Sequence, residues 1–152
     1  MGQKPEFKEG EGPVLPPIRD ADAFRALDPS RVAEKTAPVM EAIRQIRAGL
    51  TREGFDATAL IGFAGAPFTL ASYLVEGGPS KNHEHTKAMM HGDPELWHEL
   101  CGRLAQIAGA FLRVQAQAGA SVVQLFDSWV GALSRQDYET FVQPPSPFAL
   151  AA

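Results

Sequence analysis

The sequence predicts an α/β protein made of parallel strands with flanking helices, and more specifically part of a (β/α)8 TIM barrel. Two short runs, Leu60–Ala64 and Ser121–Phe126, are almost wholly apolar, as in parallel strands that are covered on both faces. A helical pattern follows each run, and the polar residues Asp127 and Ser128 come directly after the second one. Active sites of such barrels collect at the carboxyl ends of the strands. A complete barrel needs roughly 250 residues, so these 152 residues predict only part of one.

The N-terminal third is expected to hold loop and helix. Residues 1–19 are rich in proline and glycine and are interpreted as loop. Asp20 is placed to cap a short helix that runs through Leu27. A long helix to about Gly49 follows, and Pro38 inside its pattern predicts a kink or a break into two helices. The apolar positions of this helix recur at helical spacing and are Val32, Val39, Met40, Ile43, Ile46 and Leu50.

The first apolar run leads into a helix through a turn that contains glycine and proline. Gly62 and Gly65 remove side chains where the backbone bends or where another group comes close. Pro67 is tolerated in the first turn of a helix, and the pair Gly77-Gly78 predicts where that helix ends. The stretch is therefore interpreted as a strand, a turn and a helix, which is the repeating unit of parallel α/β proteins.

The second half repeats this unit. Asp93 and Pro94 predict the start of the longest helix, which ends at Gly119 and leads into the second strand. Its buried stripe is expected to comprise Leu96, Leu100, Leu104, Ile107, Phe111 and Val114. Cys101 lies beside this stripe and is interpreted as a small core residue rather than a nucleophile. A further helix is expected over residues 132–142.

Two histidines, His83 and His85, raise the question of a metal site. On a strand, a His-x-His pair points both rings to the same side. Here the pair precedes a helical pattern, and residues two apart on a helix do not face each other. We therefore interpret both as solvated surface histidines and expect no metal.

Composition narrows the classes of function. The net charge of −4 argues against a nucleic-acid partner, which would favour clustered Lys and Arg. No apolar run approaches the roughly 20 residues needed to cross a bilayer, and the first twelve residues carry no apolar signal core. The single cysteine excludes an intrachain disulfide and fits a reducing compartment. We expect a cytoplasmic protein with neither nucleic acid nor membrane as a partner.

Three motifs resemble one family of enzymes. The run GFAGAPFTLASYLVEGG, residues 62–78, is similar to the signature segment of uroporphyrinogen decarboxylases. The run QLFDS, residues 124–128, resembles a later strand of that family, which ends at the substrate cleft. GEGP at residues 10–13, with PPIR at 16–19, resembles the loop before the family's first long helix here. The resemblance spans residues 2 to about 144.

The resemblance implies an activity, a substrate and site residues. Family members remove carboxyl groups from four acetate side chains of uroporphyrinogen III in heme biosynthesis, giving coproporphyrinogen III without a cofactor, and the full-length proteins are homodimers. Tyr73 matches a catalytic, substrate-contacting tyrosine, and Ser128 matches a serine that binds a substrate carboxylate. Phe126 is expected near the macrocycle. Asp127 matches an acidic position with a supporting or capping role at least as plausible as catalysis.

The resemblance also implies that this chain is a fragment. The family's substrate-binding aspartate and arginines would lie upstream, and its later strands and a histidine downstream. We expect a partial barrel domain over residues 1–144, an irregular tail over 145–152, and an inner sheet face left exposed. The chain alone is expected to be inactive. Two alternatives stay open: a related cobalamin-linked methyltransferase of the same barrel superfamily, or a non-catalytic remnant.

Overall fold

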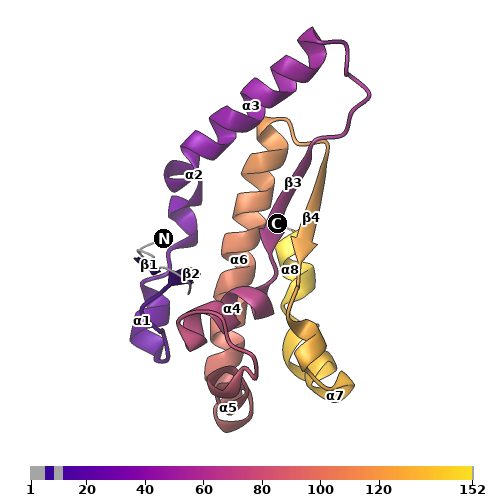
Figure 1. Cartoon of the computed structure of the whole chain (residues 1–152). Helices are drawn as coiled ribbons and strands as arrows, with labels where there is room; N and C mark the ends of the chain where they lie inside the picture. Colours follow the sequence, from indigo (N-terminus) through magenta and orange to yellow (C-terminus); the bar gives the residue numbers. More distant parts are fainter. Residues whose placement is uncertain (1–5, 9–11, 152) are drawn as a thin grey trace.

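A computed structural model describes residues 6–8 and 12–151, and it contains a two-stranded parallel sheet that lies beside a long helix (Figure 1). The strands are β3 (Ile61–Gly65) and β4 (Val122–Phe126), and their register pairs Phe63 with Gln124. The predicted parallel arrangement of these two strands is confirmed, and they are neighbours in the sheet. Between them the chain runs through α4 (Pro67–Glu76), α5 (Glu84–Gly92) and α6 (Pro94–Ala118). The structure is thus an α/β fold with one parallel strand pair.

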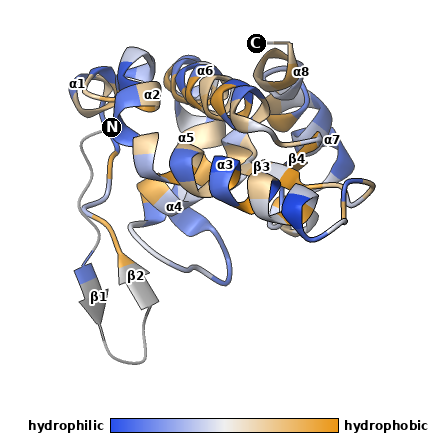
Figure 2. Cartoon of the chain, turned by 90° about the horizontal axis from the view of Figure 1, so that it is seen from above, coloured by the Kyte–Doolittle hydropathy of each residue, from blue (hydrophilic) through white to orange (hydrophobic). Residues whose placement is uncertain are grey.

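The N-terminal part departs from the expected loop. Within residues 1–19, β1 (Glu6–Lys8) and β2 (Gly12–Val14) pair antiparallel and project away from the helices in Figure 2. The glycine and proline motif at residues 10–13 lies partly outside the described residues. Residues 15–19 form a short strap along the end of α4. There the Ile18 N–H donates to the Leu74 carbonyl at 2.8 Å, and the Arg19 Nε donates to the Val75 carbonyl at 2.9 Å.

The helices that follow begin and break where the sequence predicts. Asp20 caps α1 (Ala21–Arg25) by accepting a hydrogen bond from the Ala23 N–H at 2.8 Å. The expected long helix breaks at Thr36, because Pro38 is accommodated only in the first turn of a new helix. Its parts are a 3-10 turn, η1 (Pro29–Arg31), then α2 (Val32–Lys35) and α3 (Ala37–Arg52).

The apolar stripe of α3 is narrower than the sequence suggests. Met40 and Ile43 are buried and form a small cluster with Ala118 of α6. Val39 and Ile46 belong to the predicted stripe but are about half exposed, since α3 meets α6 along only part of its length. Helical spacing of apolar residues therefore does not correspond to burial at these two positions.

The sheet is covered on one face only. Gly62 and Ala64 of β3 are buried on the side of α6, whereas Ile61 and Phe63 are each 58% exposed. Val122 and Phe126 of β4 are also about half exposed. The apolar runs suggested strands covered on both faces, which does not hold for this chain, whereas the expectation of an exposed sheet face is confirmed.

The side chain of Gln115 on α6 binds the main chain of β3. Its Oε1 accepts from the Phe63 N–H at 3.0 Å, and its Nε2 donates to the Phe63 carbonyl at 2.9 Å. Ala66, three residues further along, donates its N–H to the Phe126 carbonyl of β4 at 2.7 Å. Because peptide groups of a strand alternate in direction, Phe63 faces the edge that β4 does not occupy. Gln115 thus supplies hydrogen-bond partners for the N–H and the carbonyl of Phe63 at the unpaired edge of β3.

The main core lies between α4, α5, α6 and the N-terminal helices. Its largest fully buried side chains are Trp97, Phe24, Phe68, Met90 and Leu100. The predicted ends of the helices are confirmed: Gly77 ends α4 with φ 83°, and Gly119 ends α6 with φ 118°, both in the left-handed region that favours glycine. No helix in the described part of the chain has the length and apolar character needed to cross a membrane.

The C-terminal part differs from both expectations for it. The helix expected over 132–142 is divided into η2 (Val130–Ala132), α7 (Arg135–Asp137) and the π-helical η3 (Tyr138–Val142). The tail expected to be irregular over 145–152 contains α8 (Ser146–Leu150), which packs against α6 and buries Ala149. The expectation of an irregular tail fails because Pro147 stands in the first turn of α8, where its missing N–H costs no helical hydrogen bond.

Candidate functional site

The predicted site residues lie at the carboxyl ends of the two parallel strands. Tyr73 stands on α4, which follows β3, and Ser128 comes two residues after the end of β4. The Tyr73 ring packs on the ring of Trp129, the neighbour of Ser128, with ring centroids 4.0 Å apart. Tyr73 is half-buried and Ser128 is exposed, so a ligand could reach both. The structure therefore brings the two strand–helix units together at one place.

Phe126, the third predicted site residue, lies on the uncovered face of the sheet. It is the last residue of β4 and is 49% exposed. Its ring meets the ring of Phe63 edge-to-face, with centroids 5.8 Å apart. Two aromatic rings thus present an apolar surface on the uncovered face of the sheet, and aromatic rings contribute large apolar contact areas.

Asp127 fastens the end of β4 to the start of α4. Its Oδ1 accepts a hydrogen bond from the Thr69 hydroxyl at 2.7 Å. Burial raises the pKa of the Asp127 carboxyl, while the hydrogen bonds from Thr69 oppose that rise. This contact holds the loop that carries Ser128 and Trp129 against α4, which agrees with the supporting role considered for Asp127 from the sequence.

His83 corrects one sequence prediction. His85 is exposed as expected, but His83 is only 4% exposed. Its Nδ1 lies 2.8 Å from the Ser72 Oγ, and its ring centroid is 5.1 Å from that of Trp129. Burial lowers the pKa of His83, so its neutral form is favoured. The turn into α5 places the backbone of His83 at φ 52° and directs this ring inward, which the local spacing did not indicate.

Two further polar side chains continue from Ser72 under α4. The Ser72 and Thr86 hydroxyl oxygens are 3.1 Å apart. Thr86 donates both its N–H and its hydroxyl to Glu76 Oε1, each at 2.8 Å. Ser72, Glu76, His83 and Thr86 form a connected group that we call the α4–α5 polar cluster. Sequence reasoning missed it, and the only trace was Ser72, a serine inside the otherwise apolar stretch of α4.

Cys101 is a core residue in α6, as predicted. It is fully buried, and burial raises the pKa of its thiol far above the usual range, so the thiol stays protonated. Across residues 6–8 and 12–151, no three His, Cys, Asp or Glu side chains converge in a way that could hold a metal ion.

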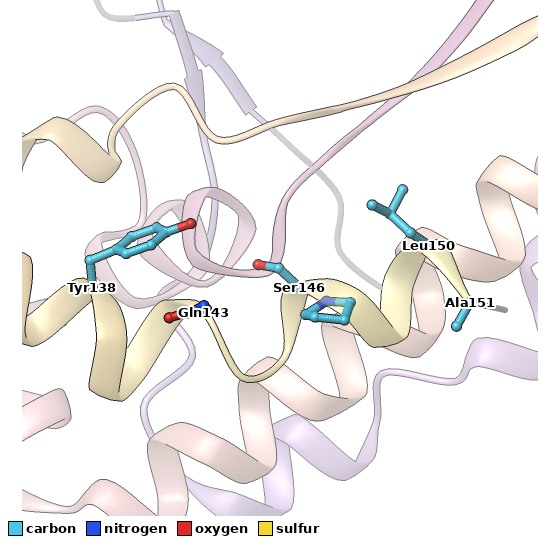
Figure 3. Close-up of a pocket in the computed structure, with 6 residues that line it drawn as sticks. Tyr138, Gln143, Ser146, Leu150 and Ala151 are labelled. Carbon is cyan, nitrogen blue, oxygen red and sulfur yellow. The ribbon is translucent and has the colours of Figure 1, made fainter.

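A hollow of about 470 Å³ lies between η3 and α8. Figure 3 shows the residues that line it, which are Tyr138, Gln143, Ser146, Pro147, Leu150 and Ala151. None of these carries a charge. The three predicted site residues do not line this hollow.

The fold and the site define an α/β chain of parallel strands whose candidate ligand-contacting residues follow the strand ends. The sequence model described as uroporphyrinogen decarboxylase (URO-D) matches residues 1–151, and the chain belongs to this family. The resemblance seen in the sequence motifs is thereby confirmed, and it extends past residue 144 into α8.

Curated relatives agree with this assignment. The chain is 60% identical over 143 residues to the uroporphyrinogen decarboxylase of Streptomyces coelicolor, covering 93% of this chain and 38% of that protein. It is 52% identical over 155 residues to that of Thermobifida fusca and 54% identical over 156 residues to that of Frankia casuarinae. These matches cover 99% and 100% of this chain, and 40% of each relative. The chain thus spans about two fifths of the length of these relatives.

Proposed function

We propose that this chain supplies one wall of the substrate cleft of a uroporphyrinogen decarboxylase, with β3 and β4 as two neighbouring strands of its TIM barrel. The observation that carries the proposal is the packing of Tyr73 on Trp129, beside Ser128, at the carboxyl ends of both strands. The reaction would convert uroporphyrinogen III to coproporphyrinogen III by removing the carboxyl groups of four acetate side chains.

The chemistry suits a site of this kind. Protonation of a pyrrole ring makes it an electron sink, so carbon dioxide can leave while the ring takes up the bonding electrons. The methylene carbon left behind then takes up a proton and the ring loses its added proton, which gives the methyl group of the product. The substrate then provides the electron sink, and the protein contributes positioning and charge stabilisation. In this proposal the Tyr73 hydroxyl acts at the reacting acetate, the Ser128 hydroxyl binds a substrate carboxylate, and Phe126 packs against the macrocycle. No cofactor is needed.

We further propose that the 152 residues alone do not complete the reaction. They span about two fifths of the relatives, so about three fifths of a relative's length has no counterpart among them. The exposed apolar face of β3 and β4 supports association with further chain, either the rest of a barrel or a second copy. A cytoplasmic location is supported by the single cysteine, which leaves no intrachain disulfide to require an oxidising compartment.

A chimera tests this proposal. The segment of the Streptomyces coelicolor relative that aligns with this chain is replaced by the chain itself, and conversion of uroporphyrinogen III is followed anaerobically by chromatography of the products. We expect an active chimera in which Tyr73→Phe and Ser128→Ala each lower kcat/KM by roughly fivefold or more, since a lost positioned hydrogen bond costs on the order of 1 kcal/mol or more. Tyr138→Phe, at an exposed tyrosine of η3, is the matched control.

Two results would contradict the proposal. The first is a folded, active chimera that neither Tyr73→Phe nor Ser128→Ala impairs. The second concerns the isolated chain: turnover by the 152 residues that disappears in Tyr73→Phe would show that the chain needs no further segments.

A further inference from the structure

Trp129 contacts two other rings at the candidate site. Its centroid is 4.0 Å from that of Tyr73 and 5.1 Å from that of His83, with interplanar angles of 39° and 44°. Tyr73 comes from α4, His83 from the turn before α5, and Trp129 from the loop after β4. Three segments of the chain therefore meet through one indole ring.

The α4–α5 polar cluster fixes the His83 ring. The Ser72 Oγ is 2.8 Å from His83 Nδ1 and 3.1 Å from the Thr86 hydroxyl oxygen. The Thr86 hydroxyl in turn donates a hydrogen bond to Glu76 Oε1 at 2.8 Å. Ser72, His83 and Thr86 are buried, so these hydrogen bonds have little competition from water. A hydrogen-bonded imidazole in a packed site has one orientation rather than several.

The cluster is built for positioning and not for chemistry of its own. A serine beside a histidine resembles an activated nucleophile, but Ser72 is fully buried, and its hydroxyl already contacts both His83 and Thr86. No substrate atom could reach it without unfolding α4. What the cluster does reach is Trp129, and through Trp129 the ring of Tyr73, which is next to Ser72 in the sequence.

We propose that His83 is a positioning residue: the Ser72 hydroxyl fixes its ring, the ring supports the Trp129 indole, and the indole fixes Tyr73 at the carboxyl edge of the sheet. The consequence for catalysis rests on the proposed function, because it is Tyr73 that would act on the substrate. The positional claim does not depend on it. Small displacements of a catalytic group are costly, since positioning supplies much of the rate enhancement in such sites.

The positional claim is tested on the 152-residue chain by 19F NMR after labelling with 3-fluorotyrosine. The chain has two tyrosines, Tyr73 and Tyr138, so Tyr138→Phe assigns both signals and the Tyr138 signal reports whether distant structure is intact. His83→Asn removes the ring, while asparagine tolerates the positive φ of 52° and retains a donor for Ser72. His85→Asn, two residues away at an exposed histidine, is the matched control.

We expect His83→Asn to move the Tyr73 signal in the same direction as Trp129→Leu does, with the Tyr138 signal unchanged. In a Trp129→Leu background, His83→Asn should have no further effect on Tyr73, because the coupling passes through the indole. Ser72→Ala keeps the ring but removes its anchor, and it should move the Tyr73 signal by a smaller amount. If His83→Asn fails to fold, Ser72→Ala decides the question by comparison with the Trp129→Leu background, where it should move the Tyr73 signal less than it does in the wild-type chain.

The proposal is overturned if the Tyr73 signal in His83→Asn, or in Ser72→Ala where that variant decides, matches the signal in His85→Asn. It is also overturned if the effects of His83→Asn and Trp129→Leu on Tyr73 simply add. The proposed function fails separately: a Tyr73 signal that responds as expected, in a folded chimera that does not convert uroporphyrinogen III, leaves the positioning role intact. In an active chimera, His83→Asn should lower kcat by no more than Tyr73→Phe does, whereas His85→Asn should leave kcat unchanged.

Discussion

Replacing Gln115 with leucine should remove the hydrogen bonds between α6 and the edge of β3 that β4 does not occupy. The Gln115 amide exchanges two hydrogen bonds with the main chain of Phe63, at 3.0 and 2.9 Å, and its Nε2 also lies 3.3 Å from the Phe111 carbonyl. Leucine has a similar size and can fill the same buried position, but it offers neither donor nor acceptor. The change therefore removes the polar contacts and largely keeps the packing.

The size of the effect follows from these contacts. Each hydrogen bond contributes about 0.5–1.5 kcal/mol net, so the two bonds to Phe63 together give about 2 kcal/mol. The third adds little, because the Phe111 carbonyl can still accept the helical hydrogen bond of α6. The Phe63 peptide groups left without partners raise the cost to about 3 kcal/mol if water reaches them poorly. For a chain of this length, that loss lowers Tm by roughly 4–12 °C.

Urea unfolding followed by far-UV circular dichroism, at one fixed protein concentration, measures this loss. Gln117→Leu, at an exposed glutamine on the same helix, is the matched control and should change stability by less than about 0.5 kcal/mol. Amide exchange at Phe63 should accelerate in Gln115→Leu and not in the control. The reasoning is refuted if Gln115→Leu and Gln117→Leu have the same free energy of unfolding within about 0.5 kcal/mol.

Three other predictions follow from local geometry. In the same unfolding assay, Gly102→Ala should stabilise the chain by about 0.5–1 kcal/mol, because nothing lies within 4 Å of the added methyl in α6. Gly62→Ala should destabilise the chain, because its added methyl would lie 3.1 Å from the Ala120 Cβ. Equal effects of the two substitutions would contradict this reasoning. Burial holds the pKa of His83 in the folded chain below its ordinary value of 6.5, so the contribution of His83 to stability is present above pH 6.5 and is lost as the pH falls. In His83→Asn, the free energy of unfolding should therefore change less steeply with pH below 6.5. An unchanged slope would disprove this prediction. The uncovered sheet face should make the chain self-associate or aggregate, as seen by size-exclusion chromatography, and Phe63→Ser should reduce this association. A wild-type chain that elutes as a single monomer peak and unfolds cooperatively on heating would count against the partial-barrel interpretation.

Local chemistry explains what the sequence could predict. Pro67 and Gly77 mark the two ends of α4, and Asp93 and Gly119 mark the ends of α6, because a helix end is decided by a few neighbouring residues. The parallel pairing of β3 and β4 followed from their apolar character and from the long helical crossover between them. Family motifs then indicated Tyr73, Phe126 and Ser128, whose roles toward a substrate remain predictions.

The parts that the sequence did not reveal depend on contacts between distant segments. His83 looks like a polar residue in a surface turn, and only the position of Ser72, 11 residues earlier, shows why its ring is buried. Gln115 lies 52 positions from its partner Phe63, so nothing near it signals its role. Pro147 was misleading, because a proline in the interior of a helix breaks it, whereas a proline in the first turn of a helix is tolerated. These errors arise where the partner of a residue is unknown.

The strap at residues 15–19 has a consequence for how the chain could be altered. The Arg19 side chain holds the last turn of α4 from 56 positions away, and Asp127 holds its first turn from 58 positions away in the other direction. The helix that carries Tyr73 is thus clamped at both ends by segments that belong to neither of its neighbours in the sequence. A protease cut or a truncation within the strap would let the end of α4 fray, and hydrogen exchange there would rise although Tyr73 itself was untouched. Substitutions around Ile18 can therefore change the stability of the last turn of α4, although they lie far from it in the sequence.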